Sequence, residues 1–249
     1  PRGGHKGKTM PVSTDIEDSR IAAERGCLST GIVLPVVPTT APWPLAHFVP
    51  PPSPSQTAEF FADYYRTNTM GIRFAALLLM LGGCLYAPFF GALAVQVRRM
   101  EGGQSGVWTY TLLLSTAVAS ATFFLSGMFF GLASFRPERS VEIQSVLNDL
   151  AWFELVIPAI PATVQAFALG LATLSAPDSA RAQPRWLGYA NLWFGMLFLP
   201  GCAIMLFKTG PFAWSGLFAF WIPGIFFVLW LGLMTWAGWR GAAQFRSPQ

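Results

Sequence analysis

Charged residues are scarce in this chain of 249 residues. They make up 11% of it, whereas a soluble domain carries roughly 25%. Nine of the 28 charged residues lie in residues 1–26, which leaves 19 for the other 223 positions. This scarcity excludes a large water-soluble core, a nucleic-acid-binding protein and a disordered tail protein. Because 53% of the residues are hydrophobic, the composition predicts an integral membrane protein whose main partner is the lipid bilayer.

Histidine and cysteine, the usual ligands of zinc and haem, are also rare. The two histidines, His5 and His47, lie outside the five strongest apolar runs. The three cysteines, Cys27, Cys84 and Cys202, stand singly, and none forms a CxxC pair. Lone cysteines in membrane helices mostly act as small apolar packing residues. The sequence therefore predicts no metal site and no cofactor, and it contains no phosphate-binding loop or serine-hydrolase elbow.

Long apolar runs without charge are what the sequence has in abundance. A membrane span needs about 20 mostly apolar residues to cross roughly 30 Å of hydrocarbon. The runs are separated by short connectors rich in Gly and Pro, which favour antiparallel neighbours. We therefore predict an all-α fold, a polytopic transmembrane helical bundle. Its five strong spans are expected near residues 72–97, 107–134, 148–175, 187–207 and 213–238.

A sixth apolar run is weaker. Residues 26–58 carry no Asp, Glu, Lys or Arg but hold four prolines between positions 35 and 44. A span at 27–49 fits the apolar residues, with kinks at the prolines that neighbouring helices can accommodate. One alternative is a Pro-rich extended segment at the interface, which would leave five spans. Another is a signal peptide, although no clean small-residue cleavage site is present. We favour six spans.

Positive residues near the ends of the spans predict the orientation. With six spans, both termini lie on the same side as the loops 98–106 and 176–185. Eight cations flank the membrane on that side (Arg20, Arg25, Arg98, Arg99, Arg181, Arg185, Arg240 and Arg246), against five on the other (Arg66, Arg73, Arg136, Arg139 and Lys208). Cytoplasmic loops carry the excess of Lys and Arg. We therefore predict a protein of the cell inner (plasma) membrane with both termini cytoplasmic.

The segments outside the spans are short. We expect a polar N-terminal tail over residues 1–26 and a C-terminal tail over 240–249. Between the first two spans, Ser55 can cap a helix, and the aromatic residues within 60–65 form an apolar stripe with a spacing of three to four. This pattern predicts a short interfacial helix over 56–67, on the outer surface.

Several short motifs point to one group of proteins. They are Pro50–Ser55, Ala58–Tyr65, Phe135–Ser140, Leu147–Trp152 and Lys208–Trp214. Together they resemble an uncharacterised family of bacterial multi-span integral membrane proteins, and the resemblance covers residues 50–239. It implies a span before the Pro-rich segment, in agreement with the weak sixth run. It implies no activity, ligand or cofactor.

Polar residues within the spans form the candidate site. Glu154 lies about one and a half turns into its predicted span, where an unpaired carboxylate is costly. Arg73 enters its own span from the same side, so that an Arg73–Glu154 pair is geometrically possible. Gln165 and Asn191 add polar groups. These four residues are the candidate intramembrane polar site. Glu154 would then belong to a site coupled to a proton or substrate, form a structural ion pair, or extend its carboxylate to the interface.

Other residue types mark positions for packing and bending. Gly127 and Gly131 form a GxxxG motif, for which we favour packing within the chain over dimerisation. Pro158 and Pro161 free backbone carbonyls at mid-membrane depth, as in the broken helices of transporters, although proline kinks also occur without transport. The tryptophans at the predicted span ends are expected as interface anchors: Trp108, Trp152, Trp186, Trp214 and Trp239.

Together these features favour a protein that is not an enzyme. The leading hypothesis is a small-solute permease or the membrane subunit of a larger assembly, with a small solute or another membrane protein as its partner. One alternative is an intramembrane enzyme acting on a lipid, for which Asp149 and Glu154 would be a weak pair of carboxylates. The other is a structural scaffold.

Overall fold

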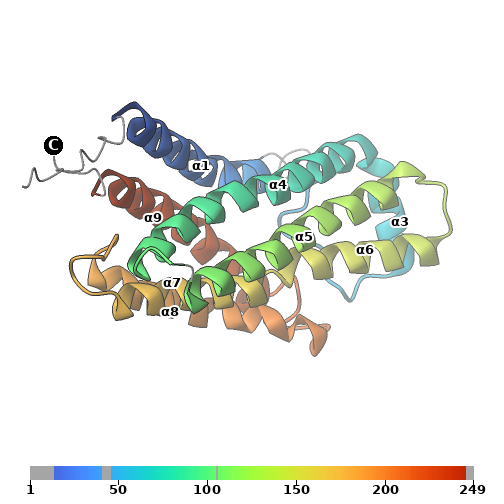
Figure 1. The fold of residues 1–249 in the computed structure, drawn as a ribbon. Coiled ribbons are helices and arrows are strands. Elements are labelled where there is room, and N and C mark those ends of the chain that lie inside the picture. Colours follow the sequence, from blue (N-terminus) through green and yellow to red (C-terminus); the bar gives the residue numbers. More distant parts are fainter. Residues whose placement is uncertain (1–13, 41–45, 105, 245–249) are drawn as a thin grey trace, which may run out of the picture.

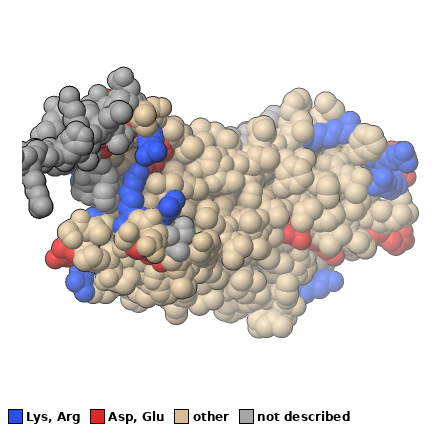
Figure 2. All heavy atoms as spheres, in the orientation of Figure 1, with Lys and Arg blue, Asp and Glu red and all other residues tan. Residues whose placement is uncertain are grey.

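The computed structural model describes residues 14–40, 46–104 and 106–244, and every regular element within these ranges is a helix. The predicted all-α fold is therefore confirmed. Five of the helices are long and apolar enough to cross a membrane, as a multi-pass membrane protein requires. They form an elongated bundle (Figure 1). Charged side chains gather toward its two ends and leave a broad uncharged band between them (Figure 2).

The five apolar helices differ in regularity. Two are continuous, and each of the other three is built from two consecutive helical segments. They comprise α4 (Thr69–Met100), α5 (Val107–Phe135), α6 (Val141–Val156) with α7 (Ala159–Ser175), α8 (Arg185–Phe198) with the 3-10 helix η1 (Leu199–Met205), and the π-helix η2 (Leu217–Trp221) with α9 (Ile222–Gln244).

Prolines lie at the breaks in the three interrupted helices. Pro158 separates α6 from α7, Pro200 lies in the first turn of η1, and Pro223 follows η2. A proline has no backbone N–H and clashes with the preceding turn, so the regular ladder of hydrogen bonds cannot continue through it. Pro88, by contrast, lies inside the continuous helix α4.

Several helices are longer than the hydrocarbon core of a bilayer. The 32 residues of α4 correspond to about 48 Å at 1.5 Å per residue, against roughly 30 Å of hydrocarbon. The span expected over 148–175 likewise begins earlier, at Val141. The spans predicted from the sequence were shorter than these helices, because their length was set by the thickness of the bilayer. The helices continue beyond that thickness.

Small residues allow α4 and α5 to pack closely. A Cβ atom at Gly127 would lie 2.6 Å from the Ala76 carbonyl oxygen, and one at Gly83 would lie 2.9 Å from the Ser120 carbonyl oxygen. The Ser120 hydroxyl donates a hydrogen bond to the Gly83 carbonyl. At Gly131 the distance to the Ala76 Cβ would be 3.6 Å. The GxxxG motif therefore packs within the chain, as favoured from the sequence.

The short helix α3 (Ala58–Thr67) agrees with the helix expected over 56–67, but its cap differs. Thr57, and not Ser55, caps it by accepting a hydrogen bond from the Phe60 N–H at 3.2 Å. One face of the helix packs against α4, α5 and α6, whereas Phe60 is exposed, and its place at the membrane interface stays a prediction. The residues buried by this packing are Phe61, Ala62 and Tyr65.

The N-terminal helix α1 (Thr14–Thr40) begins within the segment expected as a polar tail. It is not among the five helices that meet the length and hydropathy required of a span. Glu24 is buried and forms an ion pair with Arg99 at 2.7 Å, which docks the charged half of α1 on the end of α4. Part of the span expected over 27–49 lies outside the described residues, so the sixth crossing stays a prediction. The start of α1 and the end of α9 lie at the same end of the bundle (Figure 1).

Candidate functional site

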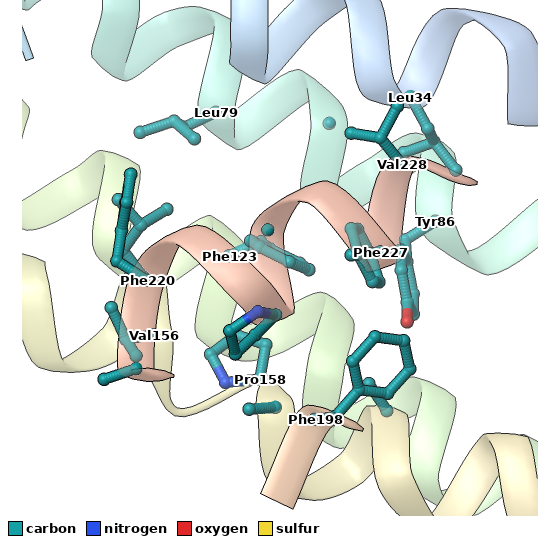
Figure 3. Close-up of a pocket in the computed structure, with 17 residues that line it drawn as sticks. Leu34, Leu79, Tyr86, Phe123, Val156, Pro158, Phe198, Phe220, Phe227 and Val228 are labelled. Carbon is teal, nitrogen blue, oxygen red and sulfur yellow. The ribbon is translucent and has the colours of Figure 1, made fainter. Parts of the chain in front are cut away.

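A cavity of about 190 Å³ lies among the helices. Its lining side chains come from α1, α4, α5, α6, α7, α8, η2 and α9. Phe123, Phe198 and Phe227 surround it together with Tyr86 (Figure 3). Among the described residues that line it, Tyr86 alone has a polar side chain and none is charged. Its wall therefore favours an apolar occupant.

Two proline breaks form part of the cavity wall. Pro158 and Pro223 both line it, from the α6–α7 junction and from the first turn of α9. Neither can donate to the carbonyl four residues earlier, that of Glu154 or of Ala219. Ala219 itself lines the cavity and belongs to the π-helix η2. Because π-helical turns and proline breaks shift a backbone off the regular helical path, the helices do not close against one another at this point.

Two glycines leave the cavity open. Gly82 lies on α4 and Gly224 on α9, and both line the cavity. A Cβ atom at either position would meet no atom within 4 Å outside its own helix backbone. Gly82 is buried whereas Gly224 is exposed. We therefore assign Gly82 to the inner wall and Gly224 to the rim, on the surface of the bundle.

Gln165 is buried beside the cavity but does not line it. Its Oε1 accepts a hydrogen bond from the Tyr86 hydroxyl at 2.6 Å, and its Nε2 donates to Thr116 Oγ1 at 3.1 Å. The chain of bonds ties α4, α7 and α5 together. The amide therefore satisfies Tyr86 and fixes the orientation of its ring.

Asn191 plays a similar part on α8. Its Oδ1 accepts from the Trp230 indole N–H at 2.7 Å, and its Nδ2 donates to the Leu187 carbonyl at 2.9 Å. Both Asn191 and Trp230 are fully buried. The geometry therefore indicates that Asn191 joins α8 to α9 and is not a solute contact.

Arg73 and Glu154 do not form the ion pair considered from the sequence. The Arg73 guanidinium donates to the carbonyl oxygens of Ser134 and Phe135, at 3.0 to 3.2 Å. Those carbonyls end α5, where a helix lacks its own donors and favours a positive charge. Among the described ion pairs none joins Arg73 to Glu154, which is partly exposed. The four residues of the candidate polar site thus do not converge.

A buried aromatic cluster lies against one end of the cavity. Trp152 and Trp214, expected as interface anchors, are buried in the protein and stack on each other with ring centroids 6.2 Å apart. Phe220 lines the cavity, and its ring centroid is also 6.2 Å from that of Trp152. Both tryptophans are buried because α3 and the segment before it cover them: the Trp214 N–H donates to the Pro52 carbonyl at 2.9 Å.

The clearest ionic site lies away from the cavity, at the start of α5. The Glu101 carboxylate accepts hydrogen bonds from the backbone N–H groups of Gly106, Trp108 and Thr109 and from the Thr109 hydroxyl. Burial by itself raises the pKa of Glu101, but the hydrogen bonds outweigh it, so that the pKa is lowered from its ordinary value of 4.5. Glu101 therefore acts as an ionised cap of α5.

No group of three or more His, Cys, Asp or Glu side chains within the described ranges is placed to hold a metal ion. Comparisons of the chain with protein-family models, with curated proteins and with solved structures found no match. The family resemblance drawn from the sequence motifs stays a prediction. The site is therefore defined by its own geometry, an apolar cavity that reaches the surface at Gly224 and has proline breaks in its wall.

Proposed function

We propose that this multi-pass membrane protein is not an enzyme and that it binds an apolar ligand from the bilayer in the cavity beside Pro158 and Pro223. The observation that carries the proposal is the lining, since Tyr86 supplies the only polar side chain among the described residues around the cavity. The Tyr86 O–H already donates to Gln165. A polar solute would leave its hydrogen-bonding groups unpaired there, at a cost of roughly 2–7 kcal/mol each.

This proposal departs from a permease for polar solutes. The polar residues that such a permease would need, Gln165 and Asn191, hold other side chains and do not line the cavity. An apolar solute dissolves in hydrocarbon and needs no carrier to cross it. Of the two roles expected from the sequence, a small-solute permease and the membrane subunit of a larger assembly, the binding of an apolar ligand therefore favours the membrane subunit. Its ligand would come from the bilayer.

We further propose six crossings of the cell inner membrane, with both termini cytoplasmic. The excess of arginine at the ends of the predicted spans supports this orientation. The Thr30 hydroxyl donates to the Leu85 carbonyl midway along α4, whereas Glu24 pairs with Arg99 at its end, so α1 runs antiparallel to α4 toward the opposite end. That path is the one a sixth crossing would take.

Cavity filling tests the proposal. Gly82→Leu places a side chain in the open space of the cavity, because no atom obstructs its Cβ. We expect heptane to raise the unfolding temperature of the purified wild-type protein in detergent, since a ligand that binds only the folded state stabilises it. The cavity has the scale of an engineered cavity of ~150 Å³ that binds benzene. Gly82→Leu should abolish this shift.

Gly91→Leu is the matched control. Gly91 lies on the same helix, its Cβ would also meet no atom within 4 Å, and it does not line the cavity. This variant should respond to heptane as the wild type does. If heptane stabilises Gly82→Leu and the wild type equally, the ligand does not occupy the cavity and the proposed function is wrong.

A further inference from the structure

Two tryptophan rings from different helices meet at one end of the bundle. Trp186 lies in the first turn of α8 and Trp236 lies two turns before the end of α9, and their ring centroids are 6.3 Å apart. Both side chains stay exposed, Trp186 at 52% and Trp236 at 40%. Exposed tryptophan rings at the ends of membrane spans suit the level of the lipid headgroups. We call these two residues the tryptophan pair.

An arginine flanks the tryptophan pair on each helix. The guanidinium carbon of Arg240 lies 4.5 Å from the centroid of the Trp236 ring, a cation–π contact that holds the side chain over the pair. On α8, Arg185 directly precedes Trp186. A Cβ atom at Gly241 would lie 3.0 Å from the Ala182 carbonyl oxygen, so the backbone next to Arg240 touches the segment that leads to Arg185. Both arginines are exposed.

The positive charge of these two arginines is not neutralised within the described part of the chain. No ion pair in the described ranges involves Arg185 or Arg240. Three acidic side chains at this end of the bundle already bind other groups: Glu24 binds Arg99, Asp178 binds Arg181, and Glu101 binds backbone N–H groups of α5. The exposed pair of cations therefore favours an anion from outside the chain.

The surface beside the tryptophan pair is apolar. Along α8, Tyr189 and Trp193 follow Trp186 at a spacing of three and then four residues, so the three side chains share one face of the helix. Tyr189 is 52% exposed and Trp193 is 69% exposed. A molecule whose charged group lies at the arginines can thus place hydrocarbon chains along this face, which points to a lipid and not to a water-soluble anion.

We propose that Arg185, Arg240 and the tryptophan pair bind the phosphate group of an anionic bilayer phospholipid. A guanidinium group offers two parallel N–H donors to phosphate oxygens, and the rings lie against the headgroup. A zwitterionic lipid also carries a phosphate, but its own positive group lies close to the two arginines and is repelled by them. The site is separate from the cavity, since neither arginine lines it, and the proposal does not depend on the ligand of the cavity.

Matched lipids test the proposal. The purified protein is equilibrated in detergent with an equimolar mixture of phosphatidylglycerol and phosphatidylcholine that carry the same acyl chains, and bound lipid is counted by native mass spectrometry. Each arginine near a lipid surface favours an anionic lipid by about fivefold, so we expect the wild type to retain about 25-fold more phosphatidylglycerol. The double variant Arg185→Gln with Arg240→Gln should retain the two lipids equally.

The control removes the same amount of charge elsewhere. Arg98 and Arg136 are exposed and lie outside the tryptophan pair, so Arg98→Gln with Arg136→Gln should keep the preference for phosphatidylglycerol. Equal retention of both lipids by the wild type would overturn the proposal. So would a control variant that loses the preference as completely as the double variant, because the effect would then be one of net charge and not of a site.

Two further measurements complete the test. If the double variant does not fold, Arg185→Gln and Arg240→Gln are measured singly, and each should lower the preference about fivefold. A single variant that retains the full preference would show that its arginine does not contact the lipid, and the two-arginine site would be wrong. Displacement of phosphatidylglycerol from the wild type by an equal concentration of inorganic phosphate would show that the arginines bind a free anion, which would also overturn the proposal.

Discussion

Pro158 and Pro223 lie on two different broken helices and line the same cavity. Each lacks the N–H that would continue its helix. The cavity therefore depends on two interruptions that face a common space, and removing either interruption should reduce it.

The first prediction follows from that dependence. Pro158→Ala restores a backbone N–H that can bond to the Glu154 carbonyl, which favours a continuous helix from α6 into α7. We expect the affinity for heptane to fall at least tenfold, measured from the concentration dependence of the unfolding temperature. Pro88→Ala is the control, since Pro88 lies in a continuous helix and does not line the cavity, and it should leave heptane affinity unchanged.

Tyr86→Phe should destabilise the fold. The change leaves the buried Gln165 Oε1 without its donor at 2.6 Å, and an unpaired buried polar group costs about 1–3 kcal/mol. Titration with sodium dodecyl sulfate measures the free energy of unfolding. The double variant with Gln165→Leu removes both partners, so its loss should be smaller than the sum of the two single losses. Additive losses would show that the two side chains are not coupled.

The stability contributed by Glu101 should depend on pH. Its pKa in the folded protein is lowered below the ordinary 4.5, so the ionised cap stabilises the fold above that pH. The contribution is lost as the pH falls through the folded pKa. We expect Glu101→Gln to cost roughly 0.5–2 kcal/mol at neutral pH and progressively less below pH 4.5. Glu138→Gln changes an exposed carboxylate and is the control, which should leave the free energy of unfolding at neutral pH unchanged.

Cysteine labelling tests the topology in intact cells. In a variant without the three native cysteines, a membrane-impermeant thiol reagent should label Gln56→Cys and Ser140→Cys and spare Ser19→Cys and Gln104→Cys. Each of these four positions is exposed. Labelling of Ser19→Cys together with Gln56→Cys would place them on one side and reduce the bundle to five crossings. Labelling of Gln104→Cys without Ser140→Cys would invert the orientation.

The sequence predicted the helices well because apolar runs and prolines are local signals. The five strong spans were each found, and the break at Pro158 follows from a property of that residue alone. The weak first run was harder to place, because the helix α1 starts among charged residues, of which Glu24 pairs with Arg99 of α4. The Glu24–Arg99 contact joins residues far apart in the chain and leaves no local pattern.

The site was less predictable, for a physical reason. The sequence marked Gln165 and Asn191 as polar groups within spans, but their donors, Tyr86 and Trp230, come from other helices. Arg73 bonds to the end of α5 because the terminal carbonyls of that helix lack donors, and side-chain charge alone does not reveal such acceptors. Gly82 gave no signal at all, because an empty space is a property of the packing around it.

The close contact between α4 and α5 has a consequence for biosynthesis. The two helices follow each other in the chain, and the glycines and serine that fit them together all lie within this one pair. Contacts between neighbouring helices form fastest, because little chain has to be ordered to bring them together. This hairpin can therefore assemble while the rest of the chain is still on the ribosome. The wall that carries Gly82 and Tyr86 would then be complete before the proline-broken helices emerge and close around it.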